Sequence, residues 1–78
     1  MINEQEFYDN FRSEFIDADE ITIDAETDFR KLDSWDSLTG MAVLVMIQDK
    51  YTDKFTEKEF KECKVSGDVF TCVNNLMS

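Results

Sequence analysis

Apolar side chains recur at helical spacing along most of this chain, beginning near its first residues. In the stretch from Asn3 to about Phe15, the residues Phe7, Phe11 and Phe15 follow at four-residue steps and mark one buried stripe. Asn3 can cap the start of this helix, and Glu6 three residues later completes the pattern of a capping box. The spacing therefore predicts a first helix over this stretch.

The stretch from Ser37 to about Tyr51 is apolar almost all the way round a helix. Ser37 suits the N-cap or the first turn, and Asp36 is well placed beside the positive helix end. A helix of this kind packs on a core with one side and favours a second apolar contact with another. Its apolar residues are Leu38, Met41, Val43, Leu44, Val45, Met46, Ile47 and Tyr51.

Two further helices are predicted in the last third of the chain. Thr56 and Glu59 form a capping-box pattern that starts a short helix ending near Cys63. A last helix is expected from Ser66 to Leu76, with an inner face made of Val69, Cys72, Val73 and Leu76. We therefore expect four helices in total.

Between the first two helices the helical period is lost, from Asp17 to Asp36. This stretch predicts a long loop held to the core by apolar anchors, and so long a loop in a small domain tends to be functional. The anchors are Ile21, Ile23, Phe29 and Leu32. The alternation Ile21-Thr22-Ile23 leaves a short strand as an alternative.

Composition favours an all-α fold. The 78 residues leave room for a single domain, residues 1–78, and the absence of Pro with only two Gly disfavours a turn-rich β architecture. We expect a small four-helix bundle with a long loop between its first two helices.

The chain is strongly acidic, with a formal net charge of −10. Residues 1–36 carry twelve acids and three bases, so nearly all of this charge lies before the second predicted helix. Such a field repels nucleic acid and anionic lipid and favours basic protein partners, although solubility alone is the simpler interpretation. No apolar run is long enough to span a bilayer, so no membrane insertion is expected.

Location is predicted from the start of the chain and from its cysteines. The first residues are acidic and lack the pattern of a signal peptide, which favours the cytoplasm. We expect Cys63 and Cys72 to be reduced and at least partly buried.

Ser37 is the residue with the most distinctive chemistry. Free N–H groups and the positive end of a helix favour a phosphate at its position, whereas the chain has no His to activate it as a nucleophile. Modification by another enzyme therefore suits Ser37 better than catalysis, with a simple capping serine as the alternative. No metal site is expected, because the acids of the loop do not match a calcium-binding pattern.

Two neighbours of Ser37 have more than one interpretation. Trp35, the single tryptophan, is expected to anchor the loop on the core, with contact to a ligand or partner as the sharper alternative. Gly40 lies one turn after Ser37, where a missing side chain would allow another molecule to approach, although chance explains a glycine there nearly as well.

The segment Leu32-Asp33-Ser34-Trp35-Asp36-Ser37-Leu38 resembles the attachment motif of the acyl and peptidyl carrier proteins. The similarity extends over most of the chain. Phe29 resembles the apolar anchor before the serine, and Val65-Ser66-Gly67-Asp68-Val69 resembles the opening of the family's last helix. Met41, Val43, Leu44 and Ile47 follow the pattern of its second helix.

The resemblance implies that Ser37, flanked by Asp36 and Leu38, receives a 4'-phosphopantetheine arm from coenzyme A through a phosphopantetheinyl transferase. The protein would catalyse nothing itself. It would present acyl intermediates, as thioesters on the arm, to acyl-transferring or synthase enzymes, for example in fatty acid biosynthesis. The matching positions Leu38, Met41 and Val45 would contact those partners, and the chain would be a monomer.

Some positions depart from the family pattern. Ser34 replaces a frequent Gly, and Thr39, Ala42 and Gln48 stand where many fatty-acid carriers place acids. A specialised carrier for an aminoacyl or peptidyl pathway therefore remains an alternative. A second class of function, a non-covalent acidic adaptor for a basic partner, also remains open.

Overall fold

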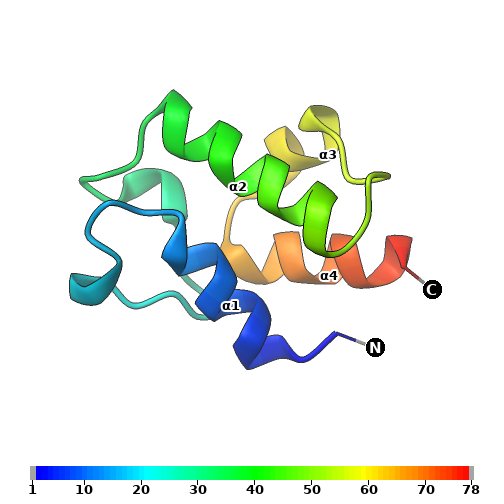
Figure 1. The fold of residues 1–78 in the computed structure, drawn as a ribbon, viewed down its shortest axis with the longest axis horizontal. Helices are drawn as coiled ribbons and strands as arrows, with labels where there is room; N and C mark the ends of the chain where they lie inside the picture. The colour runs from blue at the N-terminus through cyan, green and yellow to red at the C-terminus, as the bar shows by residue number, and fades with distance from the viewer. Residues whose placement is uncertain (1, 78) are drawn as a thin grey trace.

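The computed structural model describes residues 2–77, and this part of the chain is helical with no strand (Figure 1). The prediction of a small all-α bundle with a long first connection is confirmed. The helices are α1 (Glu4–Ser13), α2 (Ser37–Lys50), α3 (Glu57–Glu62) and α4 (Ser66–Leu76), with short 3-10 helices η1 (Ala18–Glu20) and η2 (Phe29–Lys31). None of these helices is long and apolar enough to cross a bilayer.

Aromatic side chains fill the core. Figure 1 shows α2 lying across α1 and α4, while the segment from residue 14 to 36 closes the end of the bundle at which α2 begins. Burying an aromatic side chain removes a large apolar area from water, so these rings dominate the stability of so small a domain. The fully buried large side chains are Phe7, Phe11, Phe29, Phe55, Ile47, Val43, Val69 and Val73.

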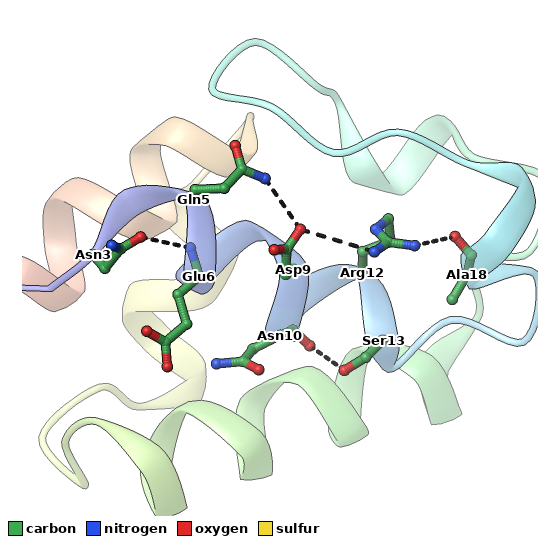
Figure 2. Close-up of polar contacts among 8 residues, drawn as sticks. All are labelled: Asn3, Gln5, Glu6, Asp9, Asn10, Arg12, Ser13 and Ala18. Carbon is green, nitrogen blue, oxygen red and sulfur yellow. Dashed lines mark hydrogen bonds and ion pairs between the residues drawn. The ribbon is translucent and has the colours of Figure 1, made fainter.

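Helix α1 is shorter than predicted, although its buried stripe is confirmed. The side chain of Asn3 accepts a hydrogen bond from the Glu6 N–H at 2.9 Å and so caps the helix, as Figure 2 shows. The helix ends at Ser13, yet Phe15 remains only 3% exposed. A turn in which the Phe15 N–H donates to the carbonyl of Arg12 at 3.0 Å returns the ring to the core.

Arg12 holds the chain that follows α1. Its guanidinium donates to the carbonyl oxygen of Ala18 at 2.6 Å and lies 3.8 Å from the carboxylate of Asp9 (Figure 2). The turn between α1 and η1 is therefore closed by a charge-assisted hydrogen bond and by the buried ring of Phe15.

The long loop is anchored as predicted. Ile23 and Phe29 are buried, and Ile21 and Leu32 pack partly buried against the core. The alternative of a short strand at residues 21–23 is wrong, since the structure assigns no strand there.

The same loop accepts hydrogen bonds from the first N–H groups of α4. The N–H groups of Ser66 and Gly67 donate to the carbonyls of Thr27 and Ala25, each at 2.9 Å. These bonds replace the helical partners that the first N–H groups of a helix lack. A β-carbon built on Gly67 would lie 2.6 Å from the Ala25 carbonyl oxygen, so a glycine is required at this close approach.

Helices α3 and α4 form where the sequence predicts them. The side chains of Thr56 and Glu59 form the capping box of α3, in which Glu59 also accepts from the Thr56 N–H at 3.0 Å. Helix α4 spans Ser66–Leu76, as predicted, with Val69 and Val73 fully buried and Cys72 and Leu76 partly so.

We predict that Gly67→Ala destabilises the protein by about 1–3 kcal/mol, because the new methyl group would collide with backbone rather than with a flexible side chain. Helix propensity alone predicts the opposite sign, since Ala is favoured over Gly by up to about 1 kcal/mol. Urea unfolding followed by fluorescence measures the effect. Thr71→Ala, at an exposed position of the same helix, serves as the control and should change stability by less than about 0.5 kcal/mol.

Candidate functional site

Ser37 is the first residue of α2, and the preceding Asp36 is the N-cap. The Asp36 carboxylate accepts a hydrogen bond from the Thr39 N–H at 2.7 Å, and the Asp36 carbonyl accepts the first helical bond from Gly40 at 3.0 Å. Of the two positions predicted for Ser37, the first turn is therefore the observed one. Its side chain is exposed, so another molecule can reach the hydroxyl.

Trp35 fixes the point at which the loop enters α2. Its ring packs edge-on against Phe29 at 5.2 Å between ring centroids and lies within 6.1 Å of Phe15 and Phe60. These three rings belong to the turn after α1, to η2 and to α3. The prediction that Trp35 anchors the loop on the core is confirmed.

Gly40 makes room for Trp35. A β-carbon at Gly40 would lie 3.0 Å from the Cζ2 atom of the indole, which is tighter than an ordinary contact. The position is buried. The group for which this glycine makes room in the structure is the indole ring, and Gly40 also lines the groove beside Ser37, so approach of another molecule there stays a prediction.

The carboxylate of Asp36 partly neutralises the positive end of α2. The hydrogen bond from the Thr39 backbone holds the pKa of Asp36 below its usual range, so the carboxylate is ionised at neutral pH. A phosphate on Ser37 would share the positive helix end with this carboxylate. The groove that Ser37 lines has charged residues of both signs, Arg30, Lys61 and Glu57, and Lys61 is paired with Glu57 at 3.1 Å.

This groove between α2 and α3 has a volume of about 280 Å³. Its apolar lining is supplied by Trp35, Gly40, Met41, Leu44 and Phe60. Sites for drug-sized ligands have volumes of about 300–1,000 Å³, so this groove suits a smaller apolar group. Arg30 also donates to the carbonyls of Phe60 and Cys63, which ties η2 to α3.

The outward side of α2 exposes three large apolar side chains. Leu38, Met41 and Val45 are 80%, 56% and 45% exposed. They line a groove of about 520 Å³ whose charged residues are Glu14, Asp49 and Lys50. We call Leu38, Met41 and Val45 the outer face of α2. The structure thus places all three predicted partner-binding residues at the surface.

The two thiols of the chain are unsuited to covalent chemistry. Cys63 is buried and Cys72 partly buried, as predicted, and both are free. Burial raises the pKa of the Cys63 thiol to about 11 and also raises that of Cys72. Both are therefore protonated, and poorly nucleophilic, at neutral pH.

Ile16 is an exposed apolar residue that sequence analysis missed. It is 94% exposed and lines a groove of about 330 Å³ together with Leu38. Its position directly after the buried Phe15 gives no periodic signal, because α1 has already ended.

Comparisons with models of protein families, with curated proteins and with solved structures yield no match to this chain. Among residues 2–77, no group of three or more His, Cys, Asp or Glu residues is arranged to hold a metal ion. The function is therefore inferred from the residues around Ser37.

We predict that Asp36→Ala lowers the urea midpoint at pH 7 more than Asp33→Ala does, because only Asp36 caps α2. The difference should fade as the pH falls. The pKa of Asp36 is lower in the folded state than in the unfolded state. Its contribution to the free energy of unfolding is therefore fully present above the ordinary aspartate pKa of about 3.9, and it is lost as the pH falls through the lower folded-state pKa. A difference that grows in acid would contradict this assignment.

Proposed function

We propose that this protein is a carrier that bears a phosphopantetheine arm on Ser37. The observation that carries the proposal is an exposed serine at the first position of a helix, held by the Asp36 cap and the packed Trp35. The sequence around it resembles the attachment motif of acyl carrier proteins. The side chain has no histidine to activate it, which favours modification by another enzyme over catalysis.

The residues present fit such an arm. Ser37 is accessible, and the N-terminal end of α2 favours a phosphodiester there. When bound, the arm supplies a terminal thiol that holds acyl groups as thioesters. Cys63 and Cys72 do not compete with it, because their thiols are protonated and at least partly buried.

The groove between α2 and α3 limits what the protein can shelter. It begins beside Ser37, and the rings of Trp35 and Phe60 form part of its wall. The interior beyond is filled by Phe29 and Phe55, each fully buried, so a long chain has no path into the core. We propose that this groove protects only a short acyl group.

The outer face of α2 is the surface that partners would contact. It is apolar, and its nearby charges are of both signs, with Glu14 and Asp49 opposed by Lys50. A surface of this kind favours a specialised aminoacyl or peptidyl pathway over a fatty-acid synthase that docks through acidic side chains. We further propose that the protein acts as a cytoplasmic monomer.

We predict that incubation with coenzyme A and a broad-specificity phosphopantetheinyl transferase adds one arm, and that Ser37→Ala abolishes the addition. Ser34→Ala is the matched control, because the Ser34 hydroxyl is buried and without a hydrogen-bond partner. Losing that group should leave both folding and modification intact. Intact mass is the measurement. An arm on Ser37→Ala, or none on the wild type, would contradict the proposal, and the second result would favour a non-covalent acidic adaptor.

We predict that Met41→Glu lowers kcat/KM for transfer to a native partner by about tenfold, because it places a charge in an apolar contact. Asp49→Asn should have a much smaller effect. Raising the ionic strength from about 0.1 M to about 1 M shortens the Debye length from about 10 Å to about 3 Å and should change the rate little.

The opposite pattern would be informative. A reaction that collapses in salt yet tolerates Met41→Glu would show that charge, not apolar contact, governs the interface.

A further inference from the structure

The groove between α2 and α3 contains a cation that pairs with no carboxylate. Arg30 lines this groove together with Ser37, and within residues 2–77 it forms no ion pair. The other two charged residues of the groove, Lys61 and Glu57, lie 3.1 Å apart and neutralise each other. The charged side chains of the groove therefore leave one positive charge, at Arg30.

Contacts with η2 and α3 hold the guanidinium of Arg30 in place. Its central carbon lies 4.7 Å from the centre of the Phe29 ring and 5.5 Å from that of the Phe60 ring. It donates to the carbonyl oxygen of Phe60 at 2.8 Å and to that of Cys63. These two bonds give Arg30 a structural role at the end of α3. A guanidinium has five N–H groups, so three remain without a partner among residues 2–77.

The remaining N–H groups of Arg30 suit a carboxylate. A planar guanidinium can donate to both oxygens of a carboxylate, and less ordering is lost on binding when the guanidinium is already held in place. Arg30 is exposed as a residue, so a ligand in the groove can reach it. An ammonium group would be repelled by the same charge.

The net charge of the protein favours a tethered anion over a free one. The chain has a formal net charge of −10, which repels anions that approach from solution. A group at the end of an arm on Ser37 stays near the groove in spite of this field, because the tether gives it a high effective concentration. Ser37 itself lines the groove. An acyl group on the arm is therefore the anion best placed to reach Arg30.

The size and the apolar wall of the groove define the rest of the acyl group. The volume is about 280 Å³, and Trp35, Met41, Leu44 and Phe60 supply the apolar wall. A short run of methylene groups suits this wall, and a carboxylate at its far end suits Arg30. A short dicarboxylic acid that is joined to the arm through one carboxyl group has both parts. An aminoacyl group has both when its own side chain ends in a carboxylate.

We propose that Arg30 makes the groove between α2 and α3 selective for a short acyl group that ends in a carboxylate, an inference that rests on the carrier function proposed above. The acyl carbons lie along the apolar wall, and the carboxylate accepts hydrogen bonds from Arg30. Arg30 is thereby a specificity-determining residue. It governs which acyl group the groove shelters and takes no part in attaching the arm.

The test compares two acyl groups of equal length on the full protein. The arm is loaded from succinyl-coenzyme A or butanoyl-coenzyme A, and intact mass confirms that the acyl group is present. Trp35 lines the groove and is the single tryptophan, so its indole N–H gives one NMR signal that reports on occupancy. Relative to the free thiol arm, the succinyl group should displace this signal at least about twice as far as the butanoyl group.

Three variants assign the difference to Arg30. Arg30→Gln should abolish the excess displacement by succinyl. Lys58→Gln is the matched control and should retain it, because Lys58 is an exposed cation of α3 that does not line this groove. Glu57→Gln should enlarge the displacement by succinyl, because Lys61 then loses its partner and adds a second free cation to the groove. This last variant leaves the bonds between Arg30 and α3 untouched.

Four outcomes overturn the proposal. In the wild type, butanoyl may displace the signal as far as succinyl does, or neither group may displace it; the groove is then not selective and the carrier function stands. An equal loss of both displacements in Arg30→Gln would leave Arg30 with its structural role alone. Should Arg30→Gln not fold, an unchanged succinyl displacement in Glu57→Gln overturns the proposal. If the wild type accepts no arm, the carrier function fails and this inference fails with it.

Discussion

The packing of Trp35 is the contact on which the arrangement of this protein depends. Its ring contacts Phe15, Phe29 and Phe60, which come from three different segments, and it fits against α2 only because residue 40 has no side chain. A domain of this size has few buried contacts to spare, so one ring shared by the turn, the loop and two helices holds a large part of its tertiary structure.

The position of Ser37 follows from that packing. With Trp35 held inside, Asp36 reaches the first free N–H groups of α2 and Ser37 begins the helix at the surface. The same helix buries Val43 and Ile47 completely and leaves the outer face of α2 to solvent. Ser37 thus stands at the capped start of α2, and apolar side chains are exposed nearby, on the outer face of α2 and at Ile16. These are the features on which the proposed carrier function rests.

The sequence predicts the fold well because its signals are local. Capping residues such as Thr56 with Glu59, and four-residue steps such as Phe7 and Phe11, report directly on helix starts and buried faces. Helix ends are less predictable. Helix α1 ends at Ser13, because the Phe15 N–H donates to the Arg12 carbonyl in a turn and does not continue the helix.

The site itself was only partly predictable. Ser37 was predicted from the motif and the outer face of α2 from the resemblance to the carrier family, and the structure places them at the surface. The groove shared by Ile16 and Leu38 depends on how the turn after α1 meets α2, and no local pattern reports on that. The pairing of Gly67 with Ala25 is a further long-range contact of this kind.

The central claim is that a single arm is attached to Ser37, and fragmentation mass spectrometry of the converted protein tests it most directly. Cleavage after Lys31 and Lys50 releases one peptide that contains both Ser34 and Ser37. We expect fragment ions to place the whole added mass on Ser37 and none on Ser34. Added mass on any other residue, or no added mass on this peptide after treatment with transferase and coenzyme A, would contradict it.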